Sequence, residues 1–134
     1  MILVDTTAWI EFVRGTGSAA HQRLAELIVA DAPVAVTEPI MMEVLAGARD
    51  DRAHADLRRL LLRCEWLPFD AAADFESAAA IYRRCRRAGV TPRGLLDCMI
   101  AAVALRHGAT LLSHDRDFSR IADTIGLRLD EPAR

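Results

Sequence analysis

The sequence predicts an α/β fold in which a mostly parallel sheet lies between layers of helices. Short apolar segments, typical of buried strands, alternate along the chain with longer segments of helical periodicity. Strands joined by helices pair in parallel and are covered on both faces. The chain has 134 residues, of which 52% are hydrophobic, so it is large enough to bury a sizeable core. We therefore expect a three-layer sandwich that forms a single domain over residues 1–134.

The first predicted element is a strand at Ile2-Leu3-Val4, which is apolar and ends at Asp5. Thr6 and Thr7 then offer an N-cap for a helix over residues 8–13, which stops near the glycines at 15 and 17. Ser18 begins a second helix, whose leucines at 24 and 27 recur at helical spacing.

The middle of the chain repeats this order of strand, cap and helix. Residues 33–36 form the next strand, and Thr37 caps a helix over 38–48 that has Pro39 in its first turn. A second, amphipathic helix is expected over 51–64.

The last part of the chain is expected to end the sheet. Pro68 restricts residues 66–69 to an edge strand or a linker. The remaining predicted elements are a helix over 70–88, a helix that follows Thr91-Pro92-Arg93-Gly94 and stops at Gly108, a strand over 109–112, a helix over 117–124 and a short strand over 127–129.

Composition excludes several function classes. The formal net charge of −2 gives no general attraction to nucleic acid, and the sequence contains no lysine, so Walker-type and Schiff-base chemistry are excluded. Cys64, Cys85 and Cys98 are far apart in helical segments, which favours buried apolar positions over a disulfide framework or a zinc site. No apolar segment is long enough to cross a bilayer and no leader pattern follows Met1, so we expect a cytoplasmic protein without membrane association.

Two acidic residues follow predicted strands. Asp5 ends the first strand, and Asp115 comes just after the strand over 109–112. In parallel α/β sheets, binding and catalytic sites form at the carboxyl ends of the strands. These two positions are therefore the first indication of a functional site.

Two other acidic residues lie in unusually apolar helices. Asp97 is surrounded by Leu, Met, Ile, Ala and Val in the segment 95–105, and Glu43 has similar neighbours in 39–47. A buried carboxylate without a partner costs several kcal/mol, or takes up a proton. We expect a positive group to compensate both.

Each acid taken alone also has an ordinary structural interpretation. Asp5 can cap the following helix, Asp97 can pair with a buried Arg, Glu43 can face solvent, and Asp115 or Asp117 can be turn and N-cap residues. The whole set is harder to explain in this way, because like charges gathered at one edge of the sheet repel. A bound cation would remove that repulsion.

Carboxylate oxygens without a Cys or His cluster suit Mg²⁺ or Mn²⁺ rather than zinc. Such a cation lowers the pKa of a bound water, which can attack a phosphodiester, and it offsets the charge that develops on the phosphoryl oxygens. The chemistry predicted for these residues is therefore that of a metal-dependent nuclease.

Four segments of the chain resemble the motifs of a known family, in the same order and at similar spacing. They are Met1-Ile2-Leu3-Val4-Asp5-Thr6-Thr7-Ala8-Trp9-Ile10, Glu43-Val44-Leu45-Ala46-Gly47, Leu96-Asp97-Cys98-Met99-Ile100-Ala101-Ala102-Val103-Ala104 and Leu111-Leu112-Ser113-His114-Asp115-Arg116-Asp117-Phe118. Each motif alone is weak evidence, but together they resemble the VapC toxins of type II toxin–antitoxin pairs, which are PIN-domain ribonucleases. The resemblance extends over nearly the whole chain.

The resemblance implies a PIN fold and an acidic quartet of Asp5, Glu43, Asp97 and Asp115 around Mg²⁺ or Mn²⁺. Asp5 and Asp97 would be the most direct ligands and Asp115 would complete the charge, whereas Glu43 would bind through water or position the nucleophile. Asp117 would be either a ligand through water or only the cap of the next helix.

Two residues beside the quartet are interpreted from the same pattern. Ser113 matches a small hydroxyl residue that the family often places two positions before the last acid. His114 is not required by the pattern and is interpreted as an incidental loop residue.

The resemblance also implies partners. They are a second copy of the chain in a homodimer, a cognate antitoxin of VapB type, and a structured RNA substrate such as tRNA or rRNA. The alternative is a catalytically silent α/β module that binds RNA or protein; four clustered acids argue against it, because such a module has no need of them.

Local positive charge would have to hold the RNA, and the candidates are Arg86, Arg87 and Arg93. A solvated helix end, where Arg complements the helix dipole, explains them equally well. Arg116, between two acids, is a candidate either for RNA contact or for an internal counter-ion.

Overall fold

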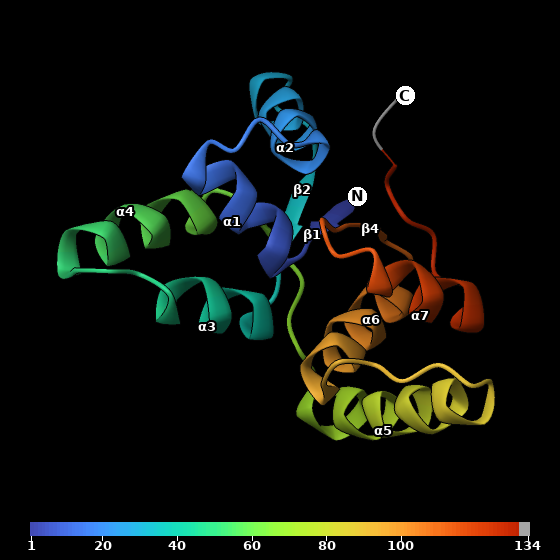
Figure 1. Ribbon diagram of the computed structural model, residues 1–134. Helices are drawn as coiled ribbons and strands as arrows, with labels where there is room; N and C mark the ends of the chain where they lie inside the picture. The colour runs from blue at the N-terminus through green and yellow to red at the C-terminus, as the bar shows by residue number, and fades with distance from the viewer. Residues whose placement is uncertain (132–134) are drawn as a thin grey trace.

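The computed structural model describes residues 1–131, and at its centre lies a four-stranded, all-parallel sheet in the order β3-β2-β1-β4 (Figure 1). The strands are β1 (Ile2–Val4), β2 (Val34–Val36), β3 (Glu65–Trp66) and β4 (Thr110–Leu112). Leu3 on the central strand pairs with Ala35 on one side and with Leu111 on the other. The predicted parallel sheet is thus confirmed, and its strands are short and buried except for β3.

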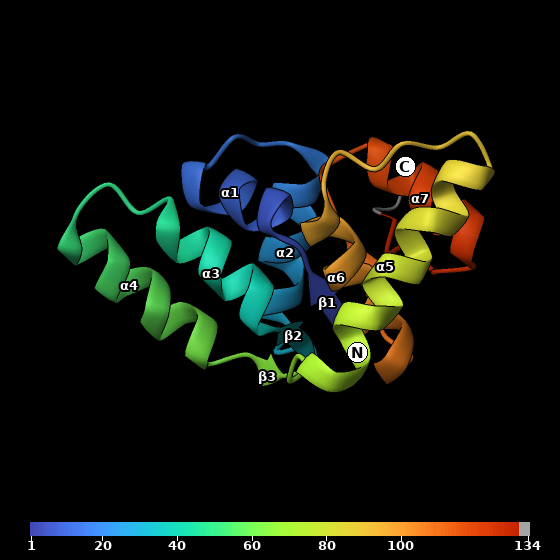
Figure 2. The same ribbon diagram turned by 90° about the horizontal axis from the view of Figure 1, so that it is seen from below.

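Helices flank the sheet, as predicted. They are α1 (Thr6–Arg14), α2 (Ala19–Val29), α3 (Glu38–Ala46), α4 (Asp51–Leu62), α5 (Ala71–Arg87), α6 (Leu95–His107) and α7 (Asp117–Ile125). Figures 1 and 2 show α1 to α4 gathered on one side of the molecule and α5 to α7 on the other. Among the described residues, no helix combines the length and the hydropathy that a membrane span requires.

Short polar side chains begin most of the helices. Ser18, Asp50 and Asp70 each accept a backbone hydrogen bond at the start of their helix. The predicted cap of α1 was wrong, because Asp5 caps this helix and Thr6 is already its first residue. The two threonines are consequently free to use their side chains elsewhere.

The hydrophobic core joins the sheet to both groups of helices. Helix α6 is apolar on nearly every side and is buried along most of its length. Cys85 and Cys98 are buried as predicted, whereas Cys64 is only partly buried. The largest fully buried side chains are Trp9, Phe118, Leu3, Leu24, Ile40, Leu61, Ile100, Leu111, Leu112 and Ile121.

One buried ion pair fixes α5 against α6. Asp74 in α5 is 1% exposed and accepts hydrogen bonds from Nε and Nη2 of Arg106 in α6, at 2.9 and 2.7 Å. Nη2 of Arg106 also donates to the carbonyl of Pro68, at 2.6 Å. This pair therefore also holds the linker between β3 and α5.

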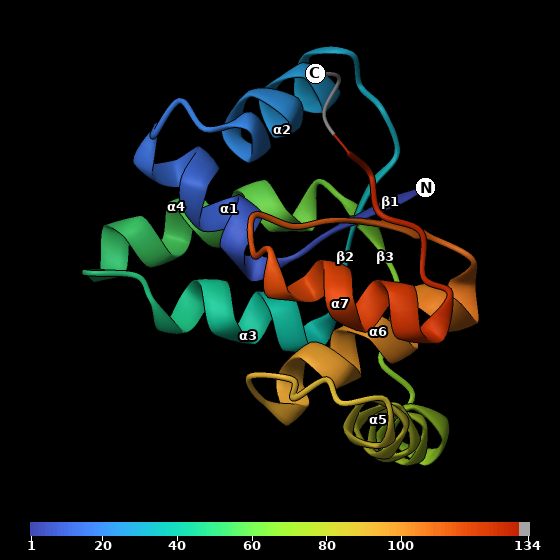
Figure 3. The ribbon, with the colours of Figure 1, turned by 45° about the vertical axis from the view of Figure 1, so that its right-hand side comes forward.

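The short strand predicted over 127–129 was wrong: only Leu129 forms a bridge, with Leu111 of β4. Beyond it the chain runs back to α2, as Figure 3 shows, where Arg23 forms a bidentate pair with Asp130 at 2.8 and 3.1 Å. Asp130 is thereby attached to a helix outside the sheet, and within residues 1–131 the pairing beside β4 is limited to the single bridge.

Candidate active site

Asp5 lies at the carboxyl end of the central strand and is almost completely buried, at 3% exposure. Its Oδ1 accepts hydrogen bonds from the Ala8 amide at 3.1 Å and the Thr7 hydroxyl at 2.7 Å, and its Oδ2 accepts one from Ser113 at 2.5 Å. Burial raises the pKa of Asp5 above its usual range, and these hydrogen bonds oppose the rise. Asp5 therefore serves both as the helix cap and as a carboxylate of the candidate site.

A network of three hydroxyl side chains connects the acidic residues. Thr6 donates to Oε1 of Glu43 at 2.6 Å, so the first residue of α1 orients a carboxylate on α3. Thr7 bonds Asp5 and accepts the His114 amide at 3.0 Å. Sequence reasoning had assigned the two threonines only to capping; their position next to a strand-end Asp was the signal that could have identified this role.

Ser113 links the first and last strands of the site. It donates to Asp5 and accepts the backbone amide of Asp115 at 3.1 Å. Since β1 and β4 are neighbours in the sheet, one serine side chain can contact both strand ends. The hydroxyl singled out in the sequence thus fixes the position of Asp115 relative to Asp5.

Asp97 enters the site from the first turn of α6 and is 9% exposed. The pKa of Asp97 is raised to about 6, chiefly by burial. Arg93 opposes this rise, and the charges of Asp115, Asp5 and Glu43 add to it. Because all three other acids act on Asp97, the structure places the four carboxylates in one electrostatic neighbourhood.

Glu43 differs from the expectation of a buried acid that needs a positive partner. It is only partly buried. In the structure it accepts a hydrogen bond from the hydroxyl of Thr6, and no cation pairs with it within residues 1–131. A hydroxyl suffices here because Glu43 keeps part of its hydration.

Asp115 lies in the loop that follows β4, and its two carboxylate oxygens differ. Oδ1 accepts the amide of Asp117 at 2.9 Å and so orders the start of α7. Oδ2 is buried and has no hydrogen-bond partner in the part of the chain that the structure describes. The guanidinium of Arg93 lies near this oxygen, with Nη1 at 3.4 Å.

Asp117 and His114 lie at the margin of the site. Asp117 is exposed and is the first residue of α7, so it is not the cap of that helix. Nε2 of His114 is 3.4 Å from Oε1 of Glu11, which connects the loop after β4 to α1. His114 therefore helps to position this loop against α1, which its sequence context did not indicate.

The candidate arginines have different surroundings. Arg86 donates to the hydroxyl of Thr91 at 2.9 Å, and Arg87 is exposed at the end of α5. Arg93 contacts Asp97 at 3.8 Å as well as Asp115. Among residues 1–131 the internal counter-ion of the acids is Arg93, and Arg116 makes no ion pair there.

The residues of the site fit a hard divalent cation that keeps much of its water. No three side chains of metal-binding type within residues 1–131 are grouped closely enough to enclose an ion by themselves. Mg²⁺ requires only one or two direct carboxylates. The buried Oδ2 of Asp115 lacks a donor within residues 1–131, and burial, with a smaller contribution from the other acids, raises the pKa of Asp97, so added positive charge would be stabilised here.

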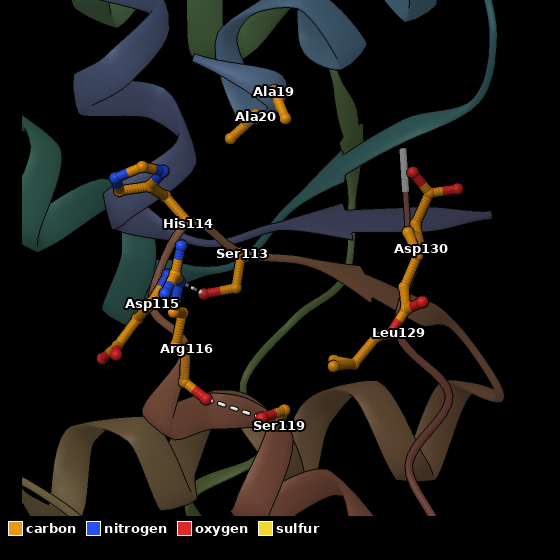
Figure 4. A pocket seen from close by; sticks show the side chains of 10 residues that line it. Ala19, Ala20, Ser113, His114, Asp115, Arg116, Ser119, Leu129 and Asp130 are labelled. Atoms are coloured by element: carbon orange, nitrogen blue, oxygen red, sulfur yellow. Dashed lines mark hydrogen bonds between the residues drawn. The ribbon is translucent and has the colours of Figure 1, made fainter. Parts of the chain in front are cut away.

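A cavity of about 640 Å³ opens beside the acids. Figure 4 shows His114 to Arg116 along one side, Leu129 and Asp130 opposite them, and Ala19 and Ala20 at the start of α2 between the two. Ser113 and Asp115 belong both to this cavity and to the acidic group. Of the four acids only Asp115 lines the cavity, so the cavity offers space for a ligand beside one residue of the acidic group.

Comparisons with known proteins identify the family of the chain. The family model described as "PIN domain" matches residues 2–124. Over 129 residues the chain is 48% identical to "Ribonuclease VapC11" of Mycobacterium tuberculosis (strain H37Rv) and to "VapC ribonuclease Mb1587" of Mycobacterium bovis, and each match covers 96% of both chains.

Solved structures share the fold at lower sequence identity. The DNA-bound VapBC from Salmonella typhimurium matches with a TM-score of 0.77 and 23% identity, over 98% of each chain. VapC20 of Mycobacterium tuberculosis, described as a sarcin-ricin loop cleaving toxin, matches with a TM-score of 0.69 and 19% identity, over 98% of this chain and 100% of that one.

Proposed function

The chain belongs to the PIN-domain family and is similar to VapC ribonucleases, and we therefore propose that it is the toxin of a type II toxin–antitoxin pair and a metal-dependent endoribonuclease. We take residues 1–134 as one PIN domain. The observation that carries the proposal is the convergence of four carboxylates, from β1, α3, α6 and the loop after β4, at one edge of the sheet.

Asp5, Asp97 and Asp115 are the residues that would hold the metal, which we propose to be Mg²⁺ or Mn²⁺, with Glu43 and Asp117 acting through water. When bound, the cation would supply positive charge against the phosphoryl oxygens and lower the pKa of water in the site. The chain contributes hard oxygen ligands from two strand ends and one helix, and these elements are held by the core. Rigid support of this kind keeps ligands at fixed positions.

Glu43 is the residue that we assign to orienting the attacking water and accepting its proton. The hydrogen bond from Thr6 fixes Oε1 and leaves Oε2 available for a water molecule. Because Glu43 is only partly buried, water can reach its side chain. Thr6 is thus a positioning residue for the proposed base.

We assign RNA binding to Arg86, Arg87 and Arg93, which lie at the end of α5 and in the segment before α6. The net charge of −2 gives no overall attraction, so local arginines would have to contact the phosphates. We propose a structured RNA such as tRNA or rRNA as substrate. The relative VapC20 is described as cleaving the sarcin-ricin loop, which supports this substrate class.

A VapB-type antitoxin and a second copy of the chain are the proposed protein partners, and the cytoplasm is the proposed location. Several solved structures that share the fold are VapBC complexes, including those from Salmonella typhimurium and Haemophilus influenzae. A catalytically silent binding module is the alternative function. It would leave unexplained why buried carboxylates are kept close enough to raise the pKa of Asp97.

The test is to incubate the purified protein, free of antitoxin, with total cellular RNA and Mg²⁺ or Mn²⁺ and to map the cut ends. EDTA and Asp97→Asn should each abolish discrete cuts. Asp123→Asn, which alters an exposed carboxylate on α7, should cut like the wild type. Absence of cutting by a sample that is folded and binds metal, or full activity of Asp97→Asn, would contradict the proposal.

A further inference from the structure

Arg93 spans two carboxylates of the candidate active site. Nη1 lies 3.4 Å from Oδ2 of Asp115, and Nη2 lies 3.8 Å from Oδ1 of Asp97. Its side chain is 61% exposed, whereas those of Asp97 and Asp115 are 13% and 14% exposed. A largely solvated cation thus faces two largely buried anions.

These contacts are weaker than those of a structural ion pair in the same molecule. Arg106 donates three hydrogen bonds of 2.6 to 2.9 Å, two to Asp74 and one to Pro68. Arg93 reaches its acids only at distances longer than a normal charge-assisted hydrogen bond. Arg93 is therefore attracted to the acids without being fixed there.

The oxygen nearest to Arg93 is also the one that lacks a donor. Oδ2 of Asp115 is buried and accepts no hydrogen bond within residues 1–131. The guanidinium offsets the negative charge of this oxygen but does not supply the missing hydrogen bond. A small hard cation could contact it directly, and would compete with Arg93 for the same two carboxylates.

Arg93 lies in an irregular segment between α5 and α6, and its side chain is largely exposed. The next residue, Gly94, is the N-cap of α6 and offers no side-chain cap. The neighbouring Pro92 is buried and anchors the segment. Rotation of the long Arg93 side chain would therefore leave Asp97 in place.

We propose that Arg93 is a displaceable counter-ion, which neutralises Asp97 and Asp115 until a divalent cation binds and which, once displaced, binds a phosphate of the RNA. The inference rests on the proposed function and adds a regulatory step to it. Metal binding would release an arginine for the substrate, so metal and RNA would favour each other's binding. By linkage, this coupling has the same size in both directions.

The first experiment measures Mn²⁺ binding directly by the electron paramagnetic resonance signal of free Mn²⁺, with no RNA present. Arg93→Gln should bind Mn²⁺ about threefold to tenfold more tightly than the wild type, as expected when a partly exposed counter-ion is removed. Arg93→Lys, which keeps the charge but not the fork that spans two carboxylates, should lie between them. Arg87→Gln removes an exposed arginine that forms no ion pair with an acid among residues 1–131, and it should leave the Mn²⁺ affinity unchanged.

The second experiment measures the coupling, using fluorescence anisotropy of a labelled single-stranded oligoribonucleotide of mixed sequence. It is made in a Glu43→Gln background, which should bind without cutting. Mn²⁺ should increase RNA affinity in this background, and adding Arg93→Gln should reduce that increase by about threefold to tenfold. Adding Arg87→Gln should lower RNA affinity with and without Mn²⁺ alike, and leave the increase intact.

The outcomes separate this inference from the proposed function. If the wild type bound no Mn²⁺, the proposed metal-dependent function would fail. If the wild type bound Mn²⁺ but Arg93→Gln bound it no more tightly, Arg93 would not compete with metal, and only the inference would be overturned. If Arg93→Gln bound Mn²⁺ more tightly but left the Mn²⁺-dependent increase in RNA affinity unchanged, the transfer of Arg93 to the RNA would be refuted.

Discussion

Asp97→Asn should stabilise the folded protein in the absence of divalent metal, although it should also abolish cleavage. The side chain of Asp97 is 13% exposed and lies near three other acids, so its charged form is disfavoured in the folded state. An Asn side chain has nearly the same shape and no charge. The substitution therefore removes repulsion and a desolvation cost without creating a cavity.

The size of this effect follows from the pKa of Asp97. A rise from 3.8 to about 6 corresponds to an upper bound of about 3 kcal/mol, at about 1.4 kcal/mol per pKa unit. Solvent reaches the site and Arg93 is largely exposed, so we expect about 1 to 2 kcal/mol. For a chain of this length that stabilisation would raise Tm by about 4 to 8 °C.

The sign of the pH dependence is fixed by the direction of the pKa change. A carboxyl whose pKa is raised by folding contributes its full stability below the unfolded value of 3.8, and this is lost as pH rises through about 6. Asp97→Asn has no such loss. Its advantage over the wild type should therefore develop between about pH 4 and pH 6 and stay constant above that range.

Thermal unfolding followed by circular dichroism, with EDTA present, tests this from pH 4 to pH 8. Asp123→Asn, on the exposed side of α7, is the matched control and should show no such advantage. Mg²⁺ should then stabilise the wild type more than Asp97→Asn, because the variant lacks a ligand. A variant that is no more stable than the wild type at pH 8, or that is equally stabilised at pH 4, would refute the electrostatic reasoning.

Three further predictions follow from contacts described above. Thr6→Val should reduce the cleavage rate about tenfold to hundredfold in a folded protein, because Glu43 loses its orienting hydrogen bond. Thr6→Ser keeps the hydroxyl and should retain most of the rate, so equal rates for the two variants would contradict this role. Asp74→Ala should lower the free energy of unfolding by about 2 to 4 kcal/mol, since it leaves Arg106 without its buried partner, and urea denaturation measures the loss. The pKa of Asp74 is lowered chiefly by its hydrogen bonds from Arg106. The stability that this ion pair contributes is therefore present above pH ~4 and is lost as the pH falls below it. A wild-type urea midpoint that did not change with pH in that range would exclude the ion pair as the source of this stability. Arg87→Ala should weaken RNA binding and reduce the slope of log affinity against log salt by about 1 without changing metal affinity, and an unchanged slope would remove Arg87 from the proposed RNA contact.

Much of the fold could be predicted because it depends on patterns that are local in sequence. Buried strands are short apolar segments, and a capping Ser or Asp marks most helix starts, as Ser18 and Asp70 do. The last strand could not be predicted correctly, because the apolar pattern at 127–129 does not show that Arg23, more than a hundred residues away, holds Asp130. Long-range ion pairs of this kind leave no periodic signal.

The acidic residues of the site could be identified for a similar reason: a carboxylate in an apolar helix or at a strand end is conspicuous. The arrangement of their partners was not predictable. Thr6 donates to Glu43 because α1 and α3 meet at this edge of the sheet, and Arg93 contacts Asp115 because the segment before α6 lies beside the loop after β4. The sequence offered only Arg116 as a candidate for the internal counter-ion, and loop geometry gives that position to Arg93 instead.

The bridge between Leu111 and Leu129 also affects the solubility of the protein. Leu111 donates its amide to Arg128 and accepts the amide of Asp130, so the outer side of β4 has its backbone groups satisfied within the chain. The opposite edge, β3, is only two residues long and is followed by Leu67 and Pro68, the latter without an amide proton. Neither edge offers a long row of unpaired backbone groups to another molecule. The parallel sheet is therefore protected against strand addition and fibril formation, which is a recurrent hazard for an open sheet at high protein concentration.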